Sequence, residues 1–215
     1  IFLIALRLSE NGRMEIPKGV KYLVGIDEAG RGALAGPVAV GMFVWPLEVG
    51  DLLSATPDYP VGRDSKKLTP RMREKWFAFL TNLTKQTGAL CQVSLVAETY
   101  IDRAGIVPAV ARGLEACLEK LPGEPIEYFL KLDGSLKAPE KFVYQETIIK
   151  GDETEPIISF ASILAKVSRD KKMTKMATKF AGYGLEKHKG YGTKEHFAKV
   201  AELGLSACHR RSYFA

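Results

Sequence analysis

The chain has 215 residues, 46% of them hydrophobic and 26% charged, which is enough for one globular domain with a full core. Its three scattered cysteines exclude a disulfide framework, and the apolar run Ile1–Leu6 is too short for a membrane span and lacks a signal peptide's basic leader. We therefore expect a cytoplasmic protein outside the membrane, and the net charge of +6 permits a polyanionic partner without requiring one.

Strand signals come first along the chain. The run at 22–26 is apolar and ends at Asp27, and the run at 36–45 is rich in β-branched and aromatic residues, so we expect the two to form a hairpin. The proline-bearing stretch 46–62 predicts a loop. Thr69 as an N-cap, with Pro70 at the first helical position, then predicts a helix to about residue 85.

Helices and strands alternate in the rest of the chain. In order, the patterns predict a strand at 90–96, a helical stretch at 98–121 broken near Gly105 and Pro108, strands at 126–132 and 142–149, a long helix from Pro156, a glycine-rich basic loop at 182–192 and a helix at 194–203. Hairpin strands followed by alternating elements predict an α/β fold with a central mixed sheet flanked by helices. We expect a single domain, 1–215.

Four carboxylates stand at the edges of these apolar runs. Asp27 and Glu28 follow the first strand, Asp133 follows a later one directly before a glycine, and Asp170 lies where the long helix leaves the core. Any one of them could be a solvated turn residue, but the recurrence favours a site. Converging carboxylates are costly unless a cation neutralises them, and such a shell suits Mg²⁺ or Mn²⁺ and phosphate-ester chemistry. The pattern therefore predicts a metal-dependent nuclease.

The turn Gly30-Arg31-Gly32 follows the first acidic pair. Glycines let backbone N–H groups approach a ligand closely. A dinucleotide fingerprint is the alternative, but Gly36 comes one residue too late for it, and two adjacent carboxylates would repel a pyrophosphate. We reject that alternative.

Basic segments give weaker signals. Ser65-Lys66-Lys67 is either a solvated helix cap or a phosphate contact. Tyr191 stands between glycines in the basic loop 187–193, so we expect an exposed ring able to stack on a sugar or base. His188, His196 and His209 have no metal-ligand spacing, and we expect surface residues; His209-Arg210-Arg211 is either a solvated tail or a phosphate contact.

Six stretches together resemble one family, ribonuclease HII, the prokaryotic type 2 ribonuclease H. They are GIDEAGRGALAGPV from Gly25, DSKKL from Asp64, LDGSLKAP from Leu132, ISFASILAKVSRD from Ile158, HKGYGTKEH from His188 and HRRSYF from His209. They follow the family's order and span nearly the whole chain. Ala33 and Phe160 depart from the usual residues, away from the expected ligands. Only 24 residues precede Gly25, which argues against the sibling type, ribonuclease HIII, with its additional N-terminal substrate-binding domain.

The resemblance implies a ribonuclease H-like fold, with 181–215 forming a C-terminal substrate-binding extension. It implies that Asp27, Glu28, Asp133 and Asp170 hold two Mg²⁺ or Mn²⁺ ions and carry catalysis. It further implies that the substrate is bound by Gly30, Arg31, Gly32, Lys66 and Tyr191.

The implied reaction is endonucleolytic hydrolysis of RNA in RNA–DNA hybrids and cleavage 5′ to ribonucleotides in duplex DNA, as in ribonucleotide excision repair. Two-metal-ion catalysis would leave 3′-hydroxyl and 5′-phosphate ends. We expect a monomer, with a sliding clamp as an open alternative for a protein partner. Two rivals are weighed against this reading. A resolvase- or transposase-type nuclease of the same fold has no use for a turn and a tyrosine that read a hydroxyl. A catalytically silent nucleic-acid-binding module is disfavoured by four carboxylates, which would weaken binding to a polyanion.

Overall fold

The computed structural model describes residues 16–59 and 68–214. The apolar run Ile1–Leu6 and the segment with Ser65, Lys66 and Lys67 lie outside the described residues, so Lys66 stays a prediction. No helix in the described ranges is both long and apolar enough to cross a membrane.

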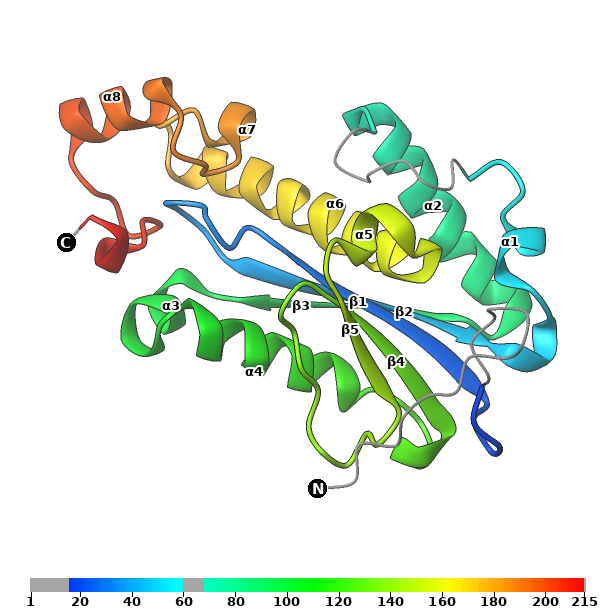
Figure 1. Ribbon diagram of the computed structural model, residues 1–215. Helices are drawn as coiled ribbons and strands as arrows, with labels where there is room; N and C mark the ends of the chain where they lie inside the picture. Colours follow the sequence, from blue (N-terminus) through cyan, green and yellow to red (C-terminus); the bar gives the residue numbers. More distant parts are fainter. Residues whose placement is uncertain (1–15, 60–67, 215) are drawn as a thin grey trace.

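A five-stranded mixed sheet forms the centre of the molecule (Figure 1). In spatial order its strands are β3 (Leu90–Val96), β2 (Val38–Pro46), β1 (Tyr22–Ala29), β4 (Tyr128–Asp133) and β5 (Gln145–Ile148). β1, β2 and β3 pair antiparallel, while β4 runs parallel to both β1 and β5. The predicted mixed sheet and the predicted hairpin of β1 with β2 are confirmed.

Helices cover both faces of this sheet (Figure 1). α2 (Pro70–Thr87) and α6 (Pro156–Lys179) close one apolar core, and α3 (Glu98–Ala104) and α4 (Ile106–Leu118) pack on the other. The shorter elements are η1 (Leu47–Val49), α1 (Leu52–Ala55), η3 (Pro125–Glu127), α5 (Gly151–Thr154), α7 (Leu185–His188), α8 (Lys194–Leu203) and η4 (Arg211–Tyr213). α7 and α8 lie beyond one end of the sheet, beside the end of α6.

Local signals located most elements well. The Thr69 hydroxyl caps α2 by accepting a hydrogen bond from the Met72 amide, and the chain breaks at Gly105 between α3 and α4. The predicted loop 46–62 was wrong in part, because Asp51 caps the short helix α1 by accepting from the Ser54 amide. The predicted loop 182–192 likewise contains α7, and the predicted strand 142–149 shortens to β5.

Two glycines let α6 lie directly on the sheet. A Cβ on Gly25 would come within 2.0 Å of the Ile157 carbonyl oxygen, and one on Gly41 within 2.3 Å of the Ala161 carbonyl oxygen. Gly41 is also the register partner of Asp27 across the hairpin. Since side chains alternate along a strand, Asp27 and Gly25 share the face that α6 covers. The absence of two side chains thus places Asp27 against the helix.

Candidate active site

Two carboxylates lie near the ends of neighbouring parallel strands on one face of the sheet: Asp133 ends β4, whereas β1 continues past Asp27 to Ala29, beyond the predicted end of that strand. The register pairs Ile26 of β1 with Leu132 of β4, so Asp27 and Asp133 come next on strands about 4.8 Å apart. Asp27 is 3% exposed and accepts a hydrogen bond from the Ser162 hydroxyl of α6. Burial raises the pKa of Asp27 well above its ordinary value, and the charges of Asp133 and Glu28 raise it further.

Glu28 brings a third carboxylate to the same strand end. Its Oε1 accepts a hydrogen bond from Arg31 Nε at 2.8 Å. Its Oε2 is buried, and among the described residues it has no hydrogen-bond partner. A buried carboxylate oxygen without a donor, beside two further carboxylates that repel one another, fits a divalent cation with oxygen ligands.

Asp170 is paired with a cation of the protein itself. Its Oδ1 accepts from Lys166 Nζ at 2.8 Å, one turn earlier on α6. Ser162, Lys166 and Asp170 follow at intervals of four residues and share one helix face, so Ser162 and Asp170 are about 12 Å apart along the axis. Within residues 16–59 and 68–214, no three acidic, histidine or cysteine side chains form a ready metal site. The set of four metal-binding carboxylates therefore stays a prediction.

The glycine turn lies beside Tyr191. Ala33 forms an antiparallel bridge with Tyr191, and the Leu34 amide donates to the Gly190 carbonyl at 2.8 Å. The expectation of an exposed ring was wrong in part, because Tyr191 is half-buried and the side chains of Lys166 and Arg169 lie 5.3 and 5.1 Å from the centre of its ring. A cavity of about 440 Å³ opens between these segments and is lined by Glu28, Ala29, Gly30, Arg31, Gly32, Arg73, Ser162, Lys166 and Tyr191. The structure thus brings together the predicted glycine turn, Tyr191 and one of the predicted carboxylates.

Two fully buried arginines hold this arrangement in place. Arg169 of α6 donates to the carbonyls of Pro37, Lys189 and Ala35 at 2.8, 3.0 and 3.2 Å. Its guanidinium lies 5.1 Å from the centre of the Tyr191 ring. A Cβ on Gly30, whose φ is +92°, would come within 1.9 Å of Arg169 Nε, so glycine is required there.

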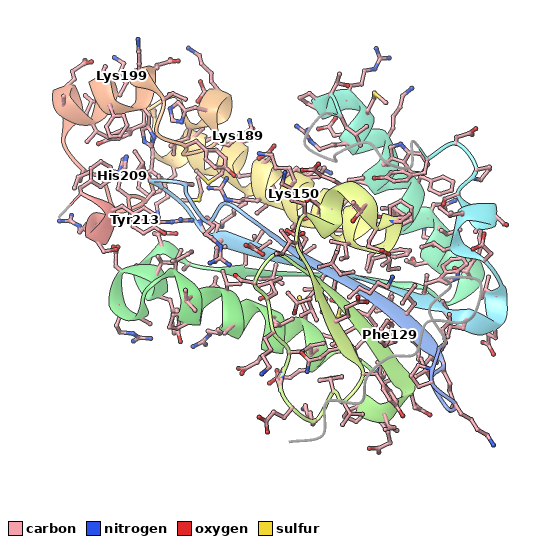
Figure 2. All side chains as sticks on the ribbon, viewed as in Figure 1. Phe129, Lys150, Lys189, Lys199, His209 and Tyr213 are labelled. Carbon is pink, nitrogen blue, oxygen red and sulfur yellow. The ribbon has the colours of Figure 1, made fainter. Side chains whose placement is uncertain are left out.

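Arg210 ties the C-terminal segment to the same turn. It donates to the carbonyls of Gly36 and Arg31, each at 2.9 Å, and the Tyr213 hydroxyl also donates to the Arg31 carbonyl. Figure 2 shows Tyr213 and His209 beside the β1–β2 connection. Arg210 is therefore a buried structural residue, and both a solvated tail and a phosphate contact were wrong for it.

A second cavity, of about 430 Å³, is bordered by basic side chains. Arg73 belongs to both cavities, and the second also holds Asp170 together with Lys171, Lys175 and Lys189. Arg73 comes from α2, whereas the lysines come from α6 and from the loop before Tyr191. The four cations outnumber the two carboxylates of this lining, Glu74 and Asp170, and such an excess of positive charge suits a nucleic-acid backbone.

The expectation that the three histidines lie on the surface was wrong. His196 and His209 are 0% and 2% exposed, and His188 is half-buried. The His188 and His196 rings stack at 4.2 Å between centres, and His196 Nε2 lies 3.1 Å from His209 Nε2. They form a core of their own beneath the Tyr191 loop.

The burial of His209 predicts acid-sensitive stability. Burial, together with the charges of His196 and Arg211, lowers the pKa of His209 from 6.5 to about 4. Between those pH values the unfolded chain binds a proton that the folded chain does not, so the free energy of unfolding falls as the pH is lowered. We expect a loss of about 3 kcal/mol through this window in urea denaturation. His209→Gln should flatten this dependence, and an unchanged slope in that variant would contradict it.

Sequence reasoning missed several residues of the site. Ser162 and Lys166 could have been found from the spacing of four that leads to Asp170. Arg73 and Arg169 gave no such signal, and Arg210 was expected at the surface, because arginine is normally exposed and the carbonyl partners of Arg169 and Arg210 are distant in the sequence.

Comparisons with known proteins agree with this geometry. The sequence model of the family described as Ribonuclease HII matches residues 24–215. The chain is 39% identical over 197 residues to the ribonuclease HII of Dehalococcoides mccartyi, covering 91% of this chain and 87% of that protein. It is 39% identical over 196 residues to the ribonuclease HII of Endomicrobium trichonymphae, with the same two coverages.

Solved structures have the same fold. The crystal structure of the ribonuclease H2 from Pyrococcus horikoshii OT3 superposes with a TM-score of 0.68 and 26% identity, covering 89% of this chain and 93% of that one. RNase HII of Archaeoglobus fulgidus, solved in complex with PCNA, superposes with a TM-score of 0.65 and 23% identity, covering 87% and 93%. Bst-RNase HIII in complex with Mn²⁺ gives 0.60 and 17%, covering 89% and 67%. The last two support the fold alone.

Proposed function

This chain belongs to the ribonuclease HII family of metal-dependent endoribonucleases, and from that premise we propose that it cuts 5′ to ribonucleotides embedded in duplex DNA and hydrolyses RNA in RNA–DNA hybrids. The products would carry 3′-hydroxyl and 5′-phosphate ends. One observation carries the proposal: Tyr191, the glycine turn and Glu28 line a single cavity. A ring able to contact a sugar thus shares this cavity with one carboxylate, Glu28, suited to a phosphate-bound cation.

The carboxylates divide into two groups in this proposal. Asp27, Glu28 and Asp133 would hold a Mg²⁺ or Mn²⁺ ion, and Asp170 would complete the set for two ions in competition with Lys166. The bound ions would supply positive charge that stabilises the transition state of phosphodiester hydrolysis. The hydroxyl of Ser162 holds the Asp27 carboxylate in place, and Arg31 does the same for Glu28.

Discrimination between RNA and DNA is assigned to the glycine turn and Tyr191. The 2′-hydroxyl is the group that distinguishes the two at one position. A Cβ on Gly32 would meet no atom within 4 Å, so a side chain there would enter open space at the cavity. The lack of a side chain at Gly32 leaves the backbone there open to a ligand in the cavity. The lack of a side chain at Gly30 leaves space for the Arg169 guanidinium.

The surroundings of the site complete the proposal. Residues 181–215 would act as a substrate-binding extension, because they contribute Tyr191 and Lys189 to the two cavities. A monomer in the cytoplasm stays a prediction. A sliding clamp remains an open partner, since the A. fulgidus relative was solved in complex with PCNA.

The test is incubation with a duplex that carries one embedded ribonucleotide, followed by mapping of both fragment ends. We expect a cut on the 5′ side that requires Mg²⁺ or Mn²⁺ and stops with EDTA. Equal cutting of an all-DNA duplex would favour the resolvase-type rival, and binding without product would favour the silent module.

Tyr191→Ala should lower kcat/KM for the embedded ribonucleotide more than for a long hybrid. Aromatic stacking on one nucleotide contributes about 1–3 kcal/mol, so we expect about a tenfold loss on the single ribonucleotide. Tyr191→Phe keeps the ring and is the matched control, expected to retain most of the activity. Equal losses on both substrates in Tyr191→Ala would count against junction recognition.

A further inference from the structure

Two buried histidines, His196 and His209, form hydrogen bonds that reach the Tyr191 backbone. His196 Nδ1 lies 3.0 Å from the Tyr191 carbonyl oxygen, and His196 Nε2 lies 3.1 Å from His209 Nε2. His209 Nδ1 in turn lies 3.0 Å from the Ser206 amide nitrogen. A continuous chain of bonds thus runs from the C-terminal segment to the residue that contacts the substrate in the proposed function.

The partners at the two ends fix the proton positions along this chain. The Ser206 amide can act solely as a donor, so His209 Nδ1 accepts and a neutral His209 carries its proton on Nε2. That proton is donated to His196 Nε2, which leaves the His196 proton on Nδ1. The carbonyl of Tyr191 can solely accept, so it takes the Nδ1–H bond. Every donor in the series meets an acceptor, and one assignment satisfies all three contacts.

His188 supports the same series from the side. Its Nδ1 accepts from the Gly190 amide at 3.2 Å, and its Nε2 lies 2.8 Å from the Tyr183 carbonyl, to which it donates. Its ring stacks on His196. Lys189 lies between His188 and Gly190 and has a positive φ of 54°. The hydrogen bond from Gly190 to His188 thereby fixes the backbone on both sides of it.

The neutral state is the one that burial enforces. His209 and His196 are almost fully covered, and burial lowers the pKa of both rings. His209 Nδ1 faces two groups of Ser206, the amide N–H at 3.0 Å and the hydroxyl oxygen at 2.9 Å, and a second proton on Nδ1 would point at the amide N–H as well as at the hydroxyl. A second proton on His196 Nε2 would face the His209 N–H. The geometry and the burial thus select the same protonation.

We propose that His196 and His209 are positioning residues that set the Tyr191 ring for recognition of an RNA–DNA junction. The proposal rests on the proposed function, because it needs Tyr191 to contact the substrate. This role differs from packing alone, because the position of the Tyr191 ring would depend on the Nδ1–H group of His196 that donates to the Tyr191 carbonyl. An imidazole that merely filled space would be replaceable without regard to which nitrogen carries the proton.

The test uses pairs of variants that keep or remove that donor. An asparagine amide can replace a donating Nδ1 and a glutamine amide a donating Nε2, so His196→Asn and His209→Gln preserve the donors that His196→Ala and His209→Ala remove. The readout is the ratio of kcat/KM on a single embedded ribonucleotide to that on a long hybrid, at neutral pH. We expect each alanine variant to lower this ratio about fivefold, as for the loss of one hydrogen bond, and each amide variant to stay within about twofold of the wild type.

Two further measurements distinguish the hydrogen-bond relay, the series from Ser206 through His209 and His196 to the Tyr191 carbonyl, from a purely structural role. In the double variant His196→Ala with Tyr191→Ala, the ratio should fall no further than in Tyr191→Ala alone, because both changes act through one residue. Ring ¹⁵N chemical shifts should report a protonated Nδ1 in His196 and a protonated Nε2 in His209. The opposite tautomer in His196 would overturn the proposal.

The remaining outcomes distinguish failure of the relay from failure of the proposed role of Tyr191. If Tyr191→Ala lowers the ratio but both alanine variants of the histidines leave it at the wild-type value, the relay is refuted and the proposed function stands. If Tyr191→Ala itself leaves the ratio unchanged, the proposed role of Tyr191 fails and the relay fails with it. Where His196→Ala does not fold, His209→Ala against His209→Gln decides, and equal ratios in that pair would refute the relay.

Discussion

Asp27→Asn is expected to abolish cleavage, by about a thousandfold or more, and at the same time to stabilise the folded protein. The catalytic loss follows because Asp27 is one of the carboxylates proposed to hold the ion. The gain in stability follows because Asp27 is buried beside Asp133 and Glu28, which raises its pKa well above 3.8. Asparagine removes the charge while its side-chain oxygen can still accept the Ser162 hydroxyl.

The sign of the stability effect depends on pH. A folded-state pKa above the unfolded value means that ionisation of Asp27 opposes folding as the pH rises. At pH 7 the variant should gain about 0.5–2 kcal/mol in free energy of unfolding, the range in which relief of a strained site commonly falls. Below pH 3.8 both states of the wild type are protonated, so the advantage should disappear. Urea denaturation at the two pH values measures both quantities.

Asp170→Asn is the matched control. Its carboxylate is paired with Lys166, so the substitution removes a favourable contact and should give no gain in stability, although the activity should fall. Mg²⁺ should raise the Tm of the wild type more than that of Asp27→Asn. An Asp27→Asn protein that is fully active with Mg²⁺, or less stable than the wild type at pH 7, would contradict this account.

Arg169→Lys is expected to be the most destabilising change in the site. The guanidinium satisfies three backbone carbonyls at once, and a lysine has a single ammonium that cannot reach all three. Each buried carbonyl left without a donor costs about 1–3 kcal/mol, so we expect a loss of about 3–5 kcal/mol after partial relaxation. The glycine turn and the Tyr191 loop should then separate, and cleavage of the single ribonucleotide should fall with them.

Arg211→Ala is the control for Arg169→Lys. Its side chain is exposed, and its backbone amide, which the substitution keeps, makes the hydrogen bond to Asp102. Its stability should change by less than about 0.5 kcal/mol. Chemical denaturation and kinetics on the same two substrates compare the variants. A lysine variant as stable as the wild type would show that Arg169 is not what joins the two loops.

The fold was predictable wherever a local signal was sufficient. β3 and α8 matched their predicted bounds, because alternation and helix capping depend on neighbouring residues. α1 was missed because four residues among prolines and glycines carry too little periodicity, even though Asp51 supplies a cap. The mixed sheet followed from the order of hairpin and alternating elements.

The site divides in the same way. Asp27 and Asp133 could be placed together because parallel strands deliver their ends to one edge of the sheet. The burial of His209 and Arg210 could not, because the partners that cover them lie in the β1–β2 connection and in the Tyr191 loop. Histidine and arginine are commonly exposed, so both residues were expected at the surface. Tertiary contacts bury them instead.

The hydrogen bond between Arg210 and Gly36 joins residues 174 positions apart, so it can form only late in synthesis. A ribosome-bound chain that lacks the segment around Arg210 can form β1 to β5 and place its acids at the strand ends. It cannot yet anchor the glycine turn, whose Arg31 carbonyl depends on Arg210 and Tyr213. If the glycine turn selects the substrate as proposed, that selection would wait until the segment around Arg210 has been synthesised and has folded back onto the turn.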